Sequence, residues 1–259
     1  MRKKFIAANL KMHFNVQEAS LYIHNLTKVL NSHRDIEVVV APSLVALQPL
    51  SKEIDTRKIK LAAQNAYFED QGAFTGEVSF SMLKGIAQYA IIGHSERRIY
   101  FQEDNKIVAN KVKAAFRNKI KPILCVGENL TERQDGHAKR VINEQLTAAL
   151  SHLTEEEVLN MVIAYEPVWA ISTFGNIKAM PDDISKMINY IRDELKYMFG
   201  EKIADSCRVI YGGSVDRSNI SSYLKIQGCD GALVGSASLK FNQFNEMAQA
   251  CLNILLGDA

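Results

Sequence analysis

The 259-residue sequence contains little proline, little cysteine, almost no net charge and no long apolar run. With 5 prolines and 14 glycines, collagen-like and proline-rich disordered chains are excluded. The 31 lysines and arginines exceed the 29 aspartates and glutamates by two, so nothing indicates a nucleic-acid or membrane-surface partner. No stretch reaches the roughly 18 apolar residues that a membrane-spanning helix needs.

The four cysteines, Cys125, Cys207, Cys229 and Cys251, lie far apart and form no Cys-x-x-Cys pair. This spacing favours free buried thiols in a reducing cytosol over a disulfide framework or a zinc site. The amino terminus begins like a signal peptide, but its apolar run stops at Asn9, short of the roughly 7–15 residues that such a signal requires. We therefore expect a cytoplasmic protein without a metal.

Short apolar, β-branched runs alternate with amphipathic stretches along the whole chain. Near-continuous apolar runs are typical of parallel strands covered on both faces. The predicted strands are residues 5–9, 36–41, 59–64, 89–93, 121–126, 160–165, 208–211 and 231–235. Residues 16–31 and 182–199 place their apolar side chains on one helical stripe. No linker divides the chain, so the pattern predicts an α/β fold with residues 1–259 in a single domain, and it favours a closed (β/α)8 barrel over an open sheet.

Polar side chains follow three of these strands, at the end where such barrels carry their chemistry. Lys11, just beyond Asn9, could balance an anionic substrate, although a lysine there is often a surface charge. His94 precedes a predicted helix start whose amides disfavour an imidazolium, although a single histidine is often structural. Glu166 lies between an apolar strand and Pro167, where a carboxylate is costly unless it is solvated, paired or used.

Two loops near the end of the chain have the composition of phosphate-binding loops. Gly212-Gly213-Ser214 follows the seventh predicted strand, and Gly235-Ser236 follows the eighth. Small residues let backbone N–H groups face an anion, and barrel phosphate sites are commonly built from these two loops.

Together, these strand-end motifs closely resemble the triosephosphate isomerase family from residue 5 to about residue 255. The motifs that carry the resemblance are Asn9-Leu10-Lys11-Met12, Ala63-Gln64-Asn65, Gly72-Ala73-Phe74-Thr75-Gly76-Glu77, Gly93-His94-Ser95-Glu96-Arg97-Arg98, Cys125-Val126-Gly127-Glu128, Ala164-Tyr165-Glu166-Pro167-Val168-Trp169-Ala170-Ile171, Tyr211-Gly212-Gly213-Ser214-Val215 and Asp230-Gly231-Ala232-Leu233-Val234-Gly235. The resemblance implies a TIM barrel that interconverts dihydroxyacetone phosphate and glyceraldehyde 3-phosphate through an enediolate, in glycolysis and gluconeogenesis, without a cofactor.

The resemblance also assigns roles to individual residues. Glu166 would be the base, His94 a neutral proton donor, and Lys11 with Asn9 the stabilisers of the developing oxyanion. Glu96 would lie next to Lys11, outside direct contact with the substrate, and orient its side chain. The substrate-binding residues would be Asn9, Lys11, Ser172, Ser214, Gly235 and Ser236, and the lid would run from Trp169 to Ala179. Thr75 would reach a neighbouring subunit's active site, which implies a homodimer.

This sequence departs from the family pattern mainly in the lid. The family typically reads Gly-Thr-Gly-Lys after Trp-Ala-Ile, whereas Ser172 opens a segment that is two residues longer here and reaches Pro181. We expect the longer lid to close less decisively without changing the reaction. Ser236, Leu10 and Gln102 replace the usual Gly, Trp and Gly without removing a reacting group. Two alternatives remain open: a non-catalytic phosphosugar-binding relative, and another aldose–ketose isomerase on a phosphate-binding barrel.

Overall fold

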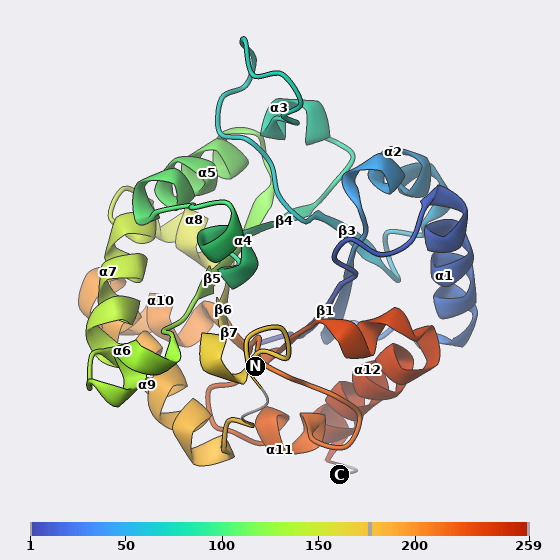
Figure 1. Ribbon diagram of the computed structural model, residues 1–259. Coiled ribbons are helices and arrows are strands. Elements are labelled where there is room, and N and C mark those ends of the chain that lie inside the picture. The colour runs from blue at the N-terminus through green and yellow to red at the C-terminus, as the bar shows by residue number, and fades with distance from the viewer. Residues whose placement is uncertain (1, 176–177, 258–259) are drawn as a thin grey trace.

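The computed structural model describes residues 2–175 and 178–257, which form a closed barrel of eight parallel strands (Figure 1). Each strand pairs with the next along the chain, and β1 also pairs with β8 to complete the ring. The strands are β1 (Lys4–Asn9), β2 (Ile36–Ala41), β3 (Lys60–Ala63), β4 (Tyr89–Ile92), β5 (Lys121–Val126), β6 (Val162–Tyr165), β7 (Arg208–Tyr211) and β8 (Gly231–Val234). The predicted α/β barrel is confirmed, and each predicted strand overlaps an observed one.

Helices surround the barrel and connect its strands (Figure 1). The α-helices are α1 (Val16–Val29), α2 (Leu44–Glu53), α3 (Phe80–Leu83), α4 (Ser95–Tyr100), α5 (Asn105–Arg117), α6 (Leu130–Gln134), α7 (Ala138–Leu150), α8 (Glu155–Leu159), α9 (Pro181–Phe199), α10 (Glu201–Ser206), α11 (Ile220–Leu224) and α12 (Phe241–Leu256). Two short 3₁₀ helices, η1 (Val168–Ala170) and η2 (Ser236–Leu239), follow β6 and β8. Both helices predicted from periodicity are present, and α9 begins at Pro181, which needs no N–H partner there.

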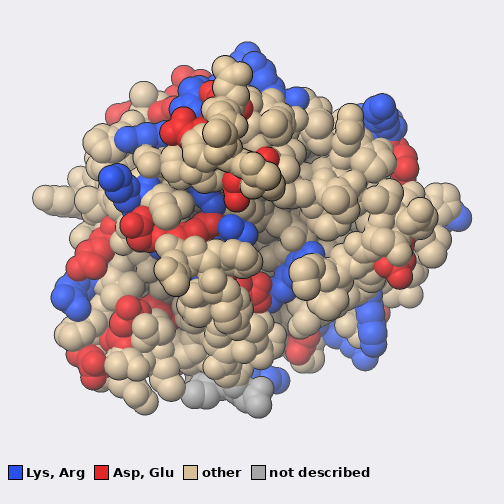
Figure 2. Space-filling model, turned by 45° about the horizontal axis from the view of Figure 1, so that its top comes forward, with Lys and Arg blue, Asp and Glu red and all other residues tan. Residues whose placement is uncertain are grey.

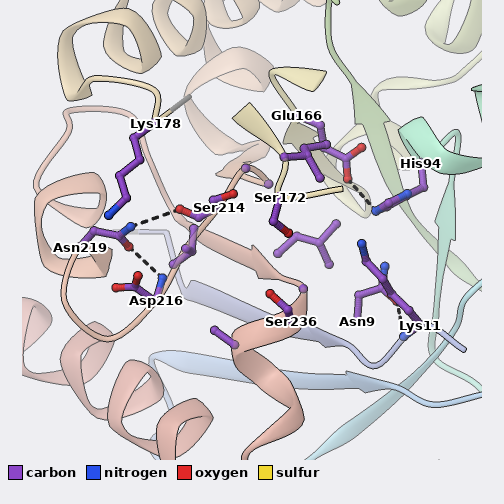
Figure 3. Close-up of a pocket in the computed structure, with 17 residues that line it drawn as sticks. Asn9, Lys11, His94, Glu166, Ser172, Lys178, Ser214, Asp216, Asn219 and Ser236 are labelled. Atoms are coloured by element: carbon purple, nitrogen blue, oxygen red, sulfur yellow. Dashed lines mark hydrogen bonds and ion pairs between the residues drawn. The ribbon is translucent and has the colours of Figure 1, made fainter. Parts of the chain in front are cut away.

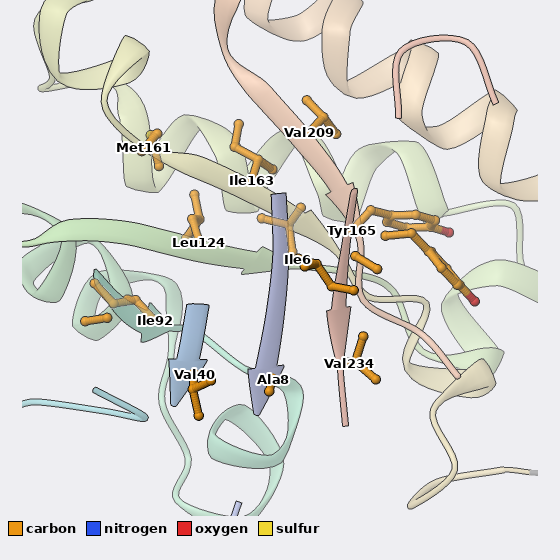
Figure 4. Close-up of a cluster of buried hydrophobic side chains, with 14 of the residues drawn as sticks. Ile6, Ala8, Val40, Ile92, Leu124, Met161, Ile163, Tyr165, Val209 and Val234 are labelled. Atoms are coloured by element: carbon orange, nitrogen blue, oxygen red, sulfur yellow. The ribbon is translucent and has the colours of Figure 1, made fainter. Parts of the chain in front are cut away.

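Successive strand side chains point to opposite faces of the sheet, and the two faces form two separate buried clusters. One cluster contains strand residues alone, among them Phe5, Val39 and Ile123, and fills the barrel interior. The intervening strand residues pack outward with helix residues into a larger cluster (Figure 4). Because successive side chains of a strand face opposite sides, this pattern decides which strand residues reach the interior.

All four cysteines are buried and free, as the sequence predicts. Burial raises the pKa of the Cys229 thiol to about 11 and that of Cys251 to about 12, so both remain protonated near neutral pH. No helix in the described ranges is long and apolar enough to cross a membrane.

The loop between β3 and α3 projects away from the barrel, at the top of Figure 1. Tyr67 stacks on Phe68 and contacts Phe74 at ring-centroid distances of 4.4 and 4.7 Å. Tyr67 also bridges to Ser79, which ties the base of the loop together. The loop is therefore a braced projection that carries Thr75, which is exposed.

Candidate active site

A cavity of about 230 Å³ opens at the carboxyl ends of the strands. Figure 3 shows that side chains at or just beyond the ends of β1, β4 and β6, together with residues of the loops after β7 and β8, converge on it. The sequence-predicted residues that line it are Asn9, Lys11, His94, Glu166, Ser172, Ser214, Gly235 and Ser236. Residues that are far apart in the chain thus share one pocket.

Glu166 directly follows β6 and is almost completely buried, with 1% of its surface exposed. Its Oε2 accepts a hydrogen bond of 3.1 Å from the backbone N–H of Ser95. Its Oε1 faces Nε2 of His94 at 3.4 Å and accepts no hydrogen bond from any described residue (Figure 3). One carboxylate oxygen is therefore held and the other is free to react.

Two glycines provide the space that Glu166 occupies. A Cβ at Gly127 would lie 1.7 Å from the Glu166 carbonyl oxygen, and one at Gly212 would lie 2.8 Å from Glu166 Cγ. Both distances are shorter than contacts between real atoms allow. Gly127 and Gly212 carry the family resemblance, but their role next to Glu166 becomes visible only in three dimensions.

His94 caps the amino terminus of α4 with its own ring. Nδ1 accepts a hydrogen bond of 3.2 Å from the backbone N–H of Glu96. An Nδ1 that accepts carries no proton, so the ring is neutral and its single N–H is on Nε2. That N–H points toward Glu166 and the pocket.

Lys11 adopts a left-handed backbone conformation, with φ of 50°, immediately after β1. Its N–H donates to Asn9 Oδ1 at 3.1 Å, and Gln64 Nε2 donates to its carbonyl oxygen at 2.8 Å. Its Nζ pairs with Glu96 Oε1 at 2.5 Å. Partial burial raises the pKa of Glu96, but the hydrogen bond and charge of Lys11 outweigh it and hold that pKa below its ordinary value.

Thr173, to which the sequence assigned no role, joins this ion pair from the lid. Its Oγ1 lies 3.3 Å from Lys11 Nζ and donates to Glu96 Oε1 at 3.0 Å. The next residue, Phe174, packs against Tyr100 of α4 with ring centroids 5.7 Å apart. The first part of the lid therefore contacts the helix that carries Glu96.

Glu128 anchors the start of the lid and is another residue without an assigned role. It is fully buried, and its Oε1 accepts hydrogen bonds from Trp169 Nε1 at 2.9 Å and Tyr165 Oη at 3.1 Å. The Arg133 guanidinium lies 4.6 Å from the Trp169 ring centroid. The sequence shows this carboxylate in the motif Gly127-Glu128. Its partner Trp169 lies so far along the chain that the pairing could not be inferred from the sequence.

Ser214 lies on the side of the pocket away from His94 (Figure 3). Its N–H and Oγ both donate to the carbonyl oxygen of Ala170, at 3.2 and 2.8 Å. The loop after β7 is thus tied to the start of the lid. In this arrangement the Ser214 amide is already engaged, and a bound phosphate would have to replace that contact.

The described part of the lid also brings Lys178 to the pocket, where its side chain points toward Asn219 (Figure 3). Asn219 accepts from the Asp216 N–H at 2.8 Å and donates to the Ser214 carbonyl oxygen at 3.2 Å. Hydrogen bonds from Ser218 and the charge of Lys178 lower the pKa of Asp216. Lys178 adds a second cation to the pocket beside Lys11.

Two predictions fall outside this pocket. Thr75 lies on the projecting loop, away from the pocket of its own chain. The predicted lid includes residues 176 and 177, which lie outside the described residues. Within residues 2–175 and 178–257 no group of three or more His, Cys, Asp or Glu side chains is arranged to hold a metal ion.

A closed (β/α)8 barrel with a buried carboxylate, a neutral imidazole and an ammonium at one mouth defines the class of (β/α)8-barrel enzymes. The family model of triosephosphate isomerase matches residues 4–251. Similar proteins include the triosephosphate isomerases of Carboxydothermus hydrogenoformans and Clostridium tetani, each 44% identical; the first alignment covers 97% of this chain and all of the relative, the second 95% of each. That of Streptococcus gordonii is also 44% identical, over 94% of this chain and 96% of its own. The chain belongs to the triosephosphate isomerase family, whose members are isomerases.

Proposed function

We propose that this chain interconverts dihydroxyacetone phosphate and D-glyceraldehyde 3-phosphate by proton transfer through an enediolate. The observation that carries the proposal is the convergence of Glu166, His94 and Lys11 on one small pocket, with Glu166 Oε1 buried and without a hydrogen bond from any residue that the structure describes. The reaction needs proton transfer alone, because the substrate carbonyl acidifies the neighbouring C–H bond.

Glu166 is the proposed base. Its free oxygen takes a proton from the carbon next to the carbonyl; the C–H electrons form the C=C bond of the enediolate while the carbonyl π electrons move onto the oxygen. A proton then passes from the hydroxyl oxygen to the former carbonyl oxygen, the C=O bond re-forms at the other carbon, and Glu166 returns its proton to the neighbouring carbon. The Ser95 N–H fixes the other oxygen at 3.1 Å, so the reactive oxygen keeps its direction. A base positioned in this way typically contributes about 10²- to 10⁴-fold to the rate.

His94 and Lys11 are proposed to stabilise the charge that develops on the substrate oxygens. The Nε2–H of His94 donates to the carbonyl oxygen, and the Glu96 N–H holds the ring in the required tautomer. Lys11, with Asn9 beside it, provides the balancing positive charge. Each preorganised donor of this kind is worth about 3–4 kcal/mol in the transition state.

The phosphate group is proposed to bind between Ser172, Ser214, Gly235 and Ser236. These residues line the same pocket as Glu166, and the cation of Lys178 lies beside them. Gripping the phosphate away from the reacting carbons lets binding energy drive closure of the lid, which excludes water from the enediolate.

We further propose that the chain works as a homodimer in the cytoplasm. The projecting loop carries Thr75, and exposed apolar side chains lie on and near it, including Phe74 and Met82; Met12, which follows Lys11, is 96% exposed. Much of the face that comes forward in Figure 2 is uncharged. An exposed apolar surface around a projecting loop is typical of an interaction site. The free buried thiols fit a reducing compartment.

A coupled isomerase assay tests the assigned base. Because Glu166→Asp withdraws the carboxylate from the substrate, we expect kcat to fall by about 10²- to 10⁴-fold. Binding of 2-phosphoglycolate, a phosphorylated mimic of the enediolate, should largely persist in calorimetry. A Glu166→Ala variant with full turnover would overturn the assignment. A wild-type chain that binds 2-phosphoglycolate but shows no turnover would instead favour the non-catalytic alternative.

A further inference from the structure

The opposite mouth of the barrel, at the amino ends of the strands, contains a second cavity of about 640 Å³. It is lined by residues from β2, β3, β5 and β7, by the segments that precede β1, β2 and β3, and by the last residues of α8 and α10. Its charged lining is almost entirely basic: Arg2, Lys3, Arg34, Arg57, Lys58, Lys60, Lys121 and Arg208, against the single carboxylate of Glu37. The proposed isomerase reaction uses none of these residues.

Strand alternation directs the inner members of this set into the barrel. Glu37 lies on the same strand face as Val39, and Lys121 on the same face as Ile123, and both apolar residues belong to the interior cluster. The same alternation places Lys60 and Arg208 inside. These four side chains therefore form the last interior layer at this mouth, below the apolar residues that fill the barrel.

The charges within this layer do not balance. Arg208 pairs with Glu37 Oε2 at 2.6 Å, and Lys60 lies 3.5 Å from Glu37 Oε1. Tyr89 Oη also donates to Glu37 Oε1, at 2.9 Å. The layer therefore holds three cations against one carboxylate, and Lys121 makes no ion pair with any described residue. Lys121 is only partly buried, so water can reach its ammonium, and the layer keeps a net positive charge that faces the cavity.

Within this inner layer, Lys121 is the cation that has no ion pair with any described residue. Burial, together with the charges of Arg208 and Lys60, lowers the pKa of its ammonium, and the attraction of Glu37 does not offset this. An anion bound between Lys121 and Lys60 would remove the imbalance. At the rim, Arg34 and Arg57 are paired with Asp35 and Asp55, while Lys3 makes no ion pair within the described chain.

The lining also limits the kind of anion. No Phe, Tyr or Trp is among the described lining residues, so the cavity offers charges to a ligand rather than a large aromatic platform. Inner and rim lysines lie at different depths, which suits a ligand with more than one charged group. We propose that this cavity binds a small anion with two or more phosphate groups, at a site separate from the active-site pocket.

Titration with inorganic pyrophosphate at low ionic strength tests this proposal, with 2-phosphoglycolate present to occupy the active-site pocket. Calorimetry gives the affinity, and backbone amide NMR shifts give the location. We expect shifts at residues 34–38, 57–60 and 120–122. The Lys60→Gln/Lys121→Gln variant should bind about tenfold or more weakly, because it loses two charge-assisted contacts. It should fold, because Glu37 keeps its pairing with Arg208.

The matched control is Lys113→Gln/Lys186→Gln, which removes two exposed lysines from α5 and α9 and leaves the cavity intact. This control should bind pyrophosphate as tightly as the wild type. Isomerase turnover reports folding in both variants, since none of the four lysines lines the active-site pocket. The proposal is overturned if the shifts are confined to Ser214 and Gly235, if the Lys60→Gln/Lys121→Gln variant keeps its affinity, or if the control loses as much.

Discussion

Lys11 occupies a backbone conformation that a lysine rarely adopts. Holding a non-glycine residue at φ of 50° costs on the order of 1–3 kcal/mol. Gln64 offsets this by donating to the carbonyl oxygens of Lys11 and Ala41, at 2.8 and 2.9 Å, which locks the turn after β1. The result is an ammonium aimed at Glu96 and the pocket. The strain is part of how the chain positions its cation.

A substitution of Thr173 tests the role of a single hydroxyl group. Thr173→Val keeps the shape of the side chain but removes the hydroxyl that joins Lys11 and Glu96. If the hydroxyl positions the ammonium, kcat/KM should fall about fivefold, the equivalent of one hydrogen bond of about 1 kcal/mol. Steady-state kinetics with glyceraldehyde 3-phosphate measure the change.

Thr173→Ser separates positioning from packing. Serine restores the hydroxyl without the methyl group, so it should recover most of the lost kcat/KM. A valine variant within twofold of the wild type, or a serine variant as impaired as the valine one, would contradict a positioning role for the hydroxyl.

The lid is the element in which we expect this chain to depart most from the family pattern. Its described first part is tethered to α4 through Thr173 and through the ring of Phe174 on Tyr100. A longer segment also loses more conformational freedom when it orders, about 1–2 kcal/mol for each backbone residue. Both features support the expectation of less decisive closure, which remains a prediction.

Deleting Phe174 and Gly175 removes as many residues as we expect this lid to have in excess of the family pattern. We expect the ratio of isomerisation to phosphate elimination to rise about tenfold or more, because two fewer residues must be ordered on closure. Assays for product and for released inorganic phosphate give the ratio. The Phe174→Ala variant removes the ring without shortening the lid. If the deletion leaves the ratio unchanged or lowers it, lid length does not limit closure.

Elements were more predictable from the sequence than contacts between them. Apolar runs placed all eight strands, because a strand buried on both faces needs such a run. Strand-end position then identified Asn9, Lys11, His94 and Glu166 as candidates. The pairing of Glu128 with Trp169 and that of Thr173 with Glu96 were not predictable, since they depend on how loops from different strands pack at the mouth. The basic layer escaped detection because a lysine at a strand start faces inward only once the ring is closed.

At the scale of the whole molecule, the active-site pocket lies at one end of the barrel, while Thr75 projects from its side. If Thr75 reaches the active-site pocket of a neighbouring subunit, each pocket contains a residue of the other chain. An isolated chain then lacks that contact. Assembly and turnover are then coupled, and a change on the projecting loop should affect both.

Thr75→Arg tests this coupling. Burying an unpaired charge at an interface costs about 3–5 kcal/mol, so the dimer should dissociate about two to four orders of magnitude more readily. We expect sedimentation to show monomers at micromolar concentration, with turnover falling in parallel. The control, Thr147→Arg, places the same charge on an exposed site of α7 and should change neither. A monomeric Thr75→Arg variant with full turnover would argue against the coupling.

Closure of the eight-stranded barrel has a consequence for folding during synthesis of the chain. β1 finds one of its two neighbours, β8, only after almost the entire chain has been synthesised, with Phe5 opposite Gly231. A Cβ at Gly231 would lie 1.7 Å from the Phe5 carbonyl oxygen, so this seam admits no side chain at that position. Until the seam forms, the nascent protein exposes two unpaired sheet edges that other chains could extend. The ribosome-bound intermediate, rather than the finished barrel, is therefore the species at greatest risk of aggregation.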